Sequence, residues 1–247
     1  MSLKGRLKKE NFGFSMPVDA PTYDRPPALM REMESFTISY ETCTDAALAL
    51  LPEADGLELA SPGVARMVFA RLPYTPWGSY NEIYQMLDCL WQGEPIIFPV
   101  RLLVDNEVAL TIGRELWGNP KKFGHITFSR DSSIIQCTGE RPKGHKVCSG
   151  LMQLGQPLEL EPAETKVLGF RVIPNPENPD EPSVAELLMN TLHVRPLQAW
   201  TGPCSLSFPE TSELDPWYKL PVKKLLGAVY TVSDMETSPS GKILKRF

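Results

Sequence analysis

Two adjacent lysines, Lys121 and Lys122, have the setting in this sequence that points most directly to chemistry. They follow Pro120 and stand before a Phe-Gly pair, within a segment (residues 113–124) that has apolar stretches on both sides. A lysine near a buried strand is costly unless it is neutral or paired, and a neutral amine is a nucleophile. The alternative is a solvated pair in a loop, which is where most lysines are found.

The residues around the lysines follow the pattern of a known family. Gly-Arg-Glu-Leu at 113–116 precedes Pro-Lys-Lys at 120–122, and Ala-Trp-Thr-Gly-Pro at 199–203 and Leu-Pro-Val-Lys at 220–223 stand downstream. In order and spacing these motifs resemble the acetoacetate decarboxylase family, over roughly residues 30–235. The resemblance implies a mainly β (α+β) fold, namely a single-domain, closed, cone-shaped β-barrel with a few flanking helices. It also implies a reactive lysine at an apolar cavity, and a homo-oligomer.

The resemblance assigns different roles to the two lysines. Lys121 corresponds to the Schiff-base lysine, and Lys122 is the neighbouring cation that can perturb its protonation. If residues 120–122 are extended, however, successive side chains point to opposite faces of the strand. The two ammonium groups then lie apart, so burial must contribute more than the charge of Lys122 to keeping the amine neutral.

A second match supplies a candidate acid and base. Tyr80-Asn81-Glu82 stands where the family has Tyr-x-Glu, ahead of the strand expected at residues 96–104. The resemblance implies that Glu82 shuttles protons during carbinolamine dehydration and carbon protonation. The alternative for Glu82 is a surface-loop carboxylate. Tyr80 is expected to line the cavity beside it.

Three further residues of the motifs are expected to support the site. Arg114 and Glu115 are interpreted as a structural ion pair that holds the lysine loop, rather than as catalytic groups. Trp200 is interpreted mainly as a packing residue that could also line the cavity.

The sequence departs from the family pattern at two places. The pattern has an arginine just before residues 36–40 and a second glutamate near residues 66–69, and ungapped alignment puts Met33 and Met67 there. Arg31 and Arg66 are close in sequence but replace neither group without a shift. Two methionines lining the cavity would suit a larger, less polar substrate than acetoacetate.

Composition excludes several classes of protein. The chain has 247 residues, with 25 Lys and Arg against 30 Asp and Glu, for a net charge of −5. This balance argues against a nucleic-acid partner, and no apolar run reaches the roughly 18 residues of a membrane helix. Without an apolar signal core at the N-terminus, we expect a cytoplasmic protein.

Five scattered cysteines and three histidines predict neither disulfides nor a metal site. His145 and Cys148 are three residues apart and are interpreted as a strand edge with a buried thiol.

The expected elements are mostly short strands, because 24 prolines and 17 glycines disfavour long helices. Residues 1–27 are expected to form an extended arm and residues 28–247 the barrel domain. Residues 174–182, with four prolines, are expected to be a stiff exposed loop. The predicted strands cover residues 36–40, 64–72, 96–104, 108–112, 126–128, 133–138 and 167–173. The predicted helices cover residues 44–51, capped by Thr44, and residues 215–229, starting around Pro221.

Together these observations predict a lyase that decarboxylates a β-keto acid through an iminium and an enamine. Because the protonated imine accepts the electrons, no metal or organic cofactor is expected. An aldolase or aldolase-dehydratase that acts on a 2-oxo acid and an aldehyde could use the same lysine. Such an enzyme needs a carboxylate clamp, which Arg71 or Arg101 could supply. A third hypothesis is a non-catalytic barrel that binds a small apolar ligand.

Overall fold

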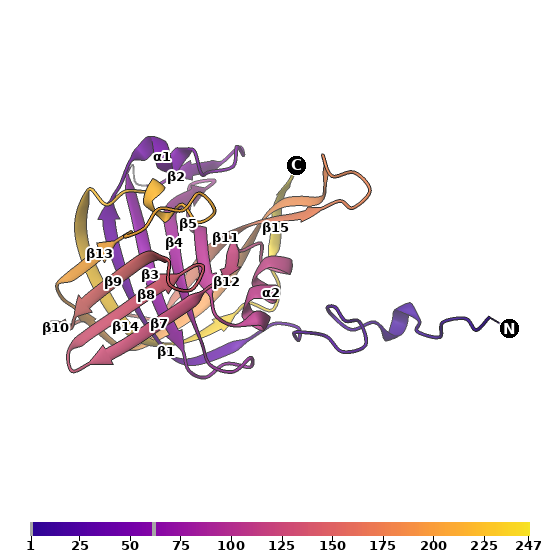
Figure 1. Cartoon of the computed structure of the whole chain (residues 1–247), viewed down its shortest axis with the longest axis horizontal. Helices are drawn as coiled ribbons and strands as arrows, with labels where there is room; N and C mark the ends of the chain where they lie inside the picture. Colours follow the sequence, from indigo (N-terminus) through magenta and orange to yellow (C-terminus); the bar gives the residue numbers. More distant parts are fainter. Residues whose placement is uncertain (1, 61–62) are drawn as a thin grey trace.

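Seven strands close into a barrel in the computed structural model, which describes residues 2–60 and 63–247 (Figure 1). The strand order around the barrel is β4-β3-β1-β14-β12-β11-β5, and pairing of β5 with β4 closes it. All neighbours are antiparallel except β11 and β5, which meet in parallel at Val167 and Ile97. The strands are β1 (Leu29–Glu41), β3 (Val64–Leu72), β4 (Tyr80–Trp91), β5 (Glu94–Val104), β11 (Ala163–Pro174), β12 (Pro182–Thr201) and β14 (Lys224–Thr237). The predicted closed, mainly β barrel is confirmed.

A second sheet of four strands lies across one side of the barrel (Figure 1). Its order is β13-β9-β8-β7, formed by β13 (Cys204–Ser207), β9 (Lys146–Gln153), β8 (Ile134–Glu140) and β7 (His125–Asp131). Phe36 of β1 stacks on Phe69 of β3 at 4.7 Å between ring centroids, and Phe128 of β7 packs on Phe36 at 6.1 Å. The main hydrophobic core therefore lies between the outer face of the barrel and this sheet.

Short elements complete the fold. Strands β2 (Leu57–Leu59), β6 (Lys121–Phe123), β10 (Gln156–Pro157) and β15 (Lys242–Arg246) extend the barrel sheet. The helices are α1 (Thr44–Leu48) and α2 (Glu107–Glu115), with 3-10 turns η1 (Lys9–Asn11) and η2 (Trp217–Lys219). None of the described helices is long and apolar enough to cross a membrane.

Strand β3 is apolar at each of residues 67–70, which are all buried. Ala65, Met67 and Phe69 belong to the core under the second sheet. Val68 and Ala70 belong to a separate cluster inside the barrel. Because successive side chains of a strand point to opposite faces, a segment buried on both faces is apolar at every position, and Arg66 and Arg71 lie outside this segment.

The predicted strand at residues 108–112 is wrong, because this segment lies in helix α2. The Asn106 side chain accepts a hydrogen bond from the Ala109 amide at 2.9 Å and caps the helix. Ala109, Ile112 and Gly113 are the buried residues of α2, with the spacing of one helix face. The apolar run thus reflects the buried side of a short helix.

The predicted helix at residues 215–229 is also wrong. The segment contains the turn η2 and the first part of β14, which pairs with both β1 and β12. Gly227 has a φ of 148° beside the register shift in the β1 pairing, a backbone conformation that favours glycine. Pairing with two distant strands therefore overrides the helical spacing of the apolar residues. The helix predicted at 44–51 is confirmed as the shorter α1, preceded by Cys43 rather than capped by Thr44.

The chain before β1 runs away from the barrel as an extended arm (Figure 1). Its outer part is solvated, and Leu3 is 92% exposed. Its inner part returns to the body, where Tyr23 is buried beside Ile112 and Trp117. The Tyr23 hydroxyl donates a hydrogen bond to Glu115 Oε2 at 2.8 Å, which fastens the arm to α2. Met1 lies outside the described residues.

Candidate active site

A cavity of about 220 Å³ occupies the interior of the barrel. Each of the seven barrel strands contributes side chains to its wall, including Met33 (β1), Ala70 (β3), Tyr84 (β4), Leu102 (β5), Val167 (β11), Asn190 (β12) and Met235 (β14). Helix α2 and the segment after it contribute Ile112, Gly113, Trp117 and Asn119. The wall is predominantly apolar, as in most sites for small molecules.

Lys121 and Glu82 meet in this cavity. The Lys121 Nζ donates a hydrogen bond to Glu82 Oε1, and both residues are buried, at 7% and 4% exposure. Of the described residues that line the cavity, only these two carry a charge. A buried pair of this kind can pass a proton between its members, which a neutral amine nucleophile requires.

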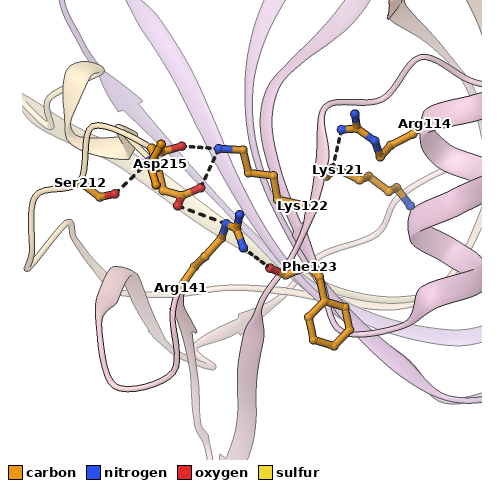
Figure 2. A network of polar contacts seen from close by, with 8 residues as sticks. Arg114, Lys121, Lys122, Phe123, Arg141, Ser212 and Asp215 are labelled. Atoms are coloured by element: carbon orange, nitrogen blue, oxygen red, sulfur yellow. Dashed lines mark hydrogen bonds and ion pairs between the residues drawn. The ribbon is translucent and has the colours of Figure 1, made fainter. Parts of the chain in front are cut away.

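The strand pairing and helix α2 position Lys121. Strand β6 pairs in parallel with β5, so that Lys121 lies opposite Leu102. Arg114 Nη1 donates a hydrogen bond to the Lys121 carbonyl oxygen at 3.0 Å (Figure 2). The Lys121 side chain crosses α2 at Gly113, where a Cβ atom would lie only 2.5 Å from Lys121 Cδ. Gly113 of the motif therefore leaves room for the Lys121 side chain, and Arg114 holds its backbone.

Lys122 points to the opposite face of β6, as the extended backbone predicts (Figure 2). Its Nζ donates hydrogen bonds to Asp215 Oδ1 at 3.1 Å and to the Leu214 carbonyl oxygen. Asp215 is buried and also pairs with Arg141, at 3.2 Å. The two lysines thus have separate carboxylate partners on separate sides of the strand.

Glu82 lies within strand β4 and not in a surface loop. Its Oε2 accepts a hydrogen bond from the Tyr84 hydroxyl, two residues further along the same face. Burial, followed by the charge of Glu82, raises the pKa of Tyr84 well above its usual value of 10.0. The same two causes raise the pKa of Tyr80, which lines the cavity on the other side of Glu82. Both phenols therefore stay protonated at neutral pH.

Two of the predicted lining residues lie elsewhere. Met67 is fully buried in the core under the second sheet, while its neighbour Val68 faces the cavity. Ungapped alignment identified the wrong face of β3, but the residues that do face the cavity, Val68 and Ala70, are also apolar. Trp200 packs on Tyr230 at 5.8 Å between centroids, outside the cavity. Met33 and Tyr80 do line the cavity.

The predicted ion pair between Arg114 and Glu115 is not formed. Arg114 binds the Lys121 backbone instead, and Glu115 accepts the hydrogen bond from Tyr23. Adjacent helical residues point in different directions, so they rarely meet. Arg114 still holds the lysine strand, through a different contact from the one expected.

Neither candidate for a carboxylate clamp reaches the cavity. Arg101 Nη1 donates a hydrogen bond to Gln85 Oε1 at 2.6 Å, on the side of β5 that faces Trp217 of η2. Arg71 lies 3.8 Å from Glu34 and is half exposed. No arginine is present among the described residues of the cavity wall.

The polar or aromatic wall residues that were not predicted from the sequence are Trp77, Tyr84, Trp117, Asn119, Thr165, Asn190 and Thr237. The buried Oδ1 of Asn119 has no hydrogen-bond partner among the described residues. Trp117 and Asn119 stand inside the Gly-Arg-Glu-Leu to Pro-Lys-Lys motif, so their position in the sequence was an available signal. Tyr84 follows Glu82 at the spacing of one strand face, a signal that requires β4 to be recognised first.

No group of three His, Cys, Asp or Glu side chains within residues 2–60 and 63–247 is placed to hold a metal ion. His145 Nδ1 lies 2.7 Å from Glu210 Oε2, and Cys148 is buried in β9. Burial raises the pKa of the Cys148 thiol to about 12.

The chain is similar to known proteins over most of its length. The family model described as acetoacetate decarboxylase matches residues 15–245. Decarboxylase DEC1 of Cochliobolus heterostrophus is 28% identical over 240 residues, which cover 93% of this chain and 94% of that protein. Acetoacetate decarboxylase of Clostridium botulinum is 27% identical over 98% of this chain and 97% of its own length.

Solved structures give the same result for the fold. The crystal structure of acetoacetate decarboxylase from Legionella pneumophila superposes with a TM-score of 0.86 and 27% identity, covering 100% of this chain and 99% of that one. The enduracididine biosynthesis enzyme MppR, complexed with pyruvate, gives a TM-score of 0.81 at 23% identity, covering 95% of this chain and 98% of its own. The similarity to MppR concerns the fold alone.

Proposed function

The chain belongs to the acetoacetate decarboxylase family, and from this premise we propose that it decarboxylates a β-keto acid through a Schiff base on Lys121. The observation that carries the proposal is the buried contact of Lys121 with Glu82 inside an apolar cavity. Membership of the family supports an enzyme with lyase-type chemistry. The residue roles and the substrate class are our inference.

The reaction begins with the transfer of a proton from Lys121 to Glu82, which frees the lone pair of the amine. The amine attacks the ketone carbon, and the ketone oxygen leaves as water with two protons that Glu82 relays from the lysine nitrogen. The resulting iminium accepts the electron pair of the breaking carbon–carboxylate bond, so carbon dioxide and a neutral enamine form. Glu82 delivers one solvent proton to the enamine carbon, and water then releases the ketone and restores Lys121.

The charge distribution favours decarboxylation over aldol addition. Loss of carbon dioxide converts an iminium and a carboxylate into neutral products, and an apolar cavity disfavours the charged species. An aldolase acting on a 2-oxo acid keeps the carboxylate to the end and needs a cation to bind it. Arg71 and Arg101 lie outside the cavity, so neither can supply this cation.

The cavity wall also supports a larger, less polar substrate than acetoacetate. Met30, Met33, Met86 and Met235 line it together with branched aliphatic side chains. Methionine side chains adapt to apolar groups of varied shape. We therefore infer that the group attached to the ketone carbon is an apolar chain or ring longer than a methyl group.

Borohydride reduction in the presence of candidate keto acids tests the proposal, with peptide mapping by mass spectrometry. We expect one adduct, on Lys121, and release of carbon dioxide that is faster with longer 3-oxo acids than with acetoacetate. Turnover of pyruvate with an aldehyde, without release of carbon dioxide, would favour the aldolase. The absence of any adduct would favour a ligand-binding barrel, and efficient turnover of acetoacetate would contradict the inferred preference for larger substrates.

We further infer that the chain forms a homo-oligomer in the cytoplasm, as its family resemblance implies. Light scattering coupled to size-exclusion chromatography, with the full chain, gives the mass in solution. A mass of 27.6 kDa, that of one chain, would contradict the homo-oligomer.

A further inference from the structure

Strand β4 places three cavity-lining side chains on one face, in the order Tyr80, Glu82 and Tyr84. Glu82 has a different donor on each carboxylate oxygen. Lys121 Nζ donates to Oε1, and the Tyr84 hydroxyl donates to Oε2. Tyr80 makes no side-chain hydrogen bond to Glu82 among the described residues.

We propose that Tyr84 is a positioning residue, which holds the Glu82 carboxylate so that one oxygen always faces the lysine nitrogen. This inference rests on the proposed function and adds a residue that the proposed chemistry does not itself require. Tyr84 acts through Glu82, and it neither attacks the substrate nor exchanges its own proton in the reaction.

The environment of Tyr84 suits this role. Because burial and the neighbouring carboxylate raise the pKa of the phenol, it keeps its proton and remains a donor at neutral pH. Donation to the charged form of a carboxylate stabilises that form. A carboxylate with one unoccupied oxygen could instead rotate or exchange its oxygens. With both oxygens bound, the proton moves between Nζ and Oε1 along a fixed line.

The position of Oε1 matters throughout the reaction. Every proton transfer proposed for Glu82 takes place at Nζ itself or at an atom two bonds from it, namely the carbinolamine oxygen or the enamine carbon. A displacement of about 1 Å can cost on the order of 10²-fold in rate. Tyr84 therefore affects the chemical steps more than substrate binding.

Tyr84→Phe tests the inference, because it removes the hydroxyl and keeps the ring. We expect kcat to fall by roughly 10- to 100-fold, the range for loss of a hydrogen bond to a charged group, with KM within about threefold. We also expect the acid limb of the pH–rate profile to move to higher pH, since the carboxylate loses a donor. The titratable wall residues that face Glu82 are Tyr80, Tyr84 and Lys121. The substitution removes the Tyr84 hydroxyl and leaves the other two groups in place.

Tyr230→Phe is the matched control. Tyr230 is buried and, like Tyr84, donates a hydrogen bond to a glutamate, here Glu34 at 2.9 Å, but this pair lies outside the cavity. We expect Tyr230→Phe to lower the melting temperature without moving the pH profile. Circular dichroism of both variants checks that each is folded.

The outcomes separate the inference from the proposed function. A Tyr84→Phe enzyme with the kcat and pH profile of the unchanged chain would overturn the role of Tyr84 and leave the Schiff base intact. Equal shifts of the pH profile in Tyr84→Phe and Tyr230→Phe would also overturn it, since the effect would then be structural. An unchanged chain that gives neither turnover nor a borohydride adduct overturns the proposed function, and the role of Tyr84 with it.

Discussion

The two faces of strand β6 place the same residue type in opposite surroundings. On the inner face, Lys121 is 7% exposed and contacts the buried Glu82 in an apolar cavity. On the outer face, the Lys122 side chain is 41% exposed and binds Asp215, which Arg141 also neutralises (Figure 2). Two adjacent residues of β6 are therefore a candidate nucleophile, Lys121, and a structural anchor, Lys122.

This difference shows that position on a strand decides the role of each lysine more than proximity in sequence does. The Lys122 ammonium forms an ion pair with Asp215 and points away from the cavity. Its electric field at the Lys121 amine is therefore reduced by distance and by solvent. The inner amine has an apolar wall and one carboxylate for its surroundings. We expect substitutions on the inner face to change the chemistry, and those on the outer face to change mainly stability.

The largest expected effect comes from Lys121→Met. Without the amine no Schiff base can form, so turnover should fall by more than about 10³-fold, as expected for loss of a nucleophile. Carbon dioxide release and borohydride trapping measure this loss directly. Lys122→Met is the same substitution one residue further on, and it should retain both activities. Retained trapping in Lys121→Met would mean that another lysine is the nucleophile.

The second effect compares the two carboxylates. Glu82→Gln keeps the shape of the inner partner but removes its ability to carry protons, and kcat should fall by roughly 10²-fold or more. Asp215→Asn makes the corresponding change at the outer partner and should alter kcat by less than about threefold. Steady-state assays of both variants with one substrate provide the test. A Glu82→Gln enzyme with full activity would exclude Glu82 from the mechanism.

The inner face could be predicted largely because its residues stand in contiguous motifs. Lys121 and its neighbours lie within ten residues, and the opposite directions of the two lysines follow from extended backbone alone. Glu82 was found from the short Tyr-x-Glu pattern, which does not depend on knowing the strand that carries it. The family resemblance also supplied the closed barrel, which local patterns by themselves do not specify.

Two of the misses at the site result from contacts between distant segments. Strand β4 was not predicted because its polar residues are buried against partners far along the chain. Gln85, for example, donates hydrogen bonds to Tyr40 and to the Trp217 carbonyl oxygen. Without β4, the alternation that places Tyr84 beside Glu82 could not be applied. Likewise, the choice between Met67 and Val68 depends on which face of β3 is inside the barrel, and an ungapped alignment does not contain this information.

The third effect comes from Gly113→Ala, which moves the inner lysine without replacing it. The new methyl group would lie 2.5 Å from Lys121 Cδ and 3.2 Å from Nζ, so the flexible lysine chain must shift. Displacement of the amine should lower kcat by roughly 10- to 100-fold. The free energy of unfolding should change little, because the helix propensity that alanine gains over glycine, up to about 1 kcal/mol, offsets the cost of shifting the lysine side chain.

Gly5→Ala is a suitable control for this prediction, since no atom lies within 4 Å of the position of its new methyl group. Thermal unfolding and turnover should both match those of the unchanged chain. If Gly113→Ala retained full activity, the close fit of α2 against Lys121 would not be needed to position the amine.

The smallest effect on chemistry is expected from Lys122→Met, which removes the outer charge. Asp215 would keep Arg141 as a partner, so the free energy of unfolding should fall by only about 1–2 kcal/mol. The two side chains leave β6 on opposite faces, and burial of the inner amine is unaltered. Inactivation by an amine-directed acylating reagent at neutral pH should therefore proceed within about threefold of the rate for the unchanged chain. If inactivation of Lys122→Met instead required strongly alkaline pH, the charge of the neighbouring lysine would be the main activator of the amine, and the separation of the two faces would have less influence on reactivity than we infer.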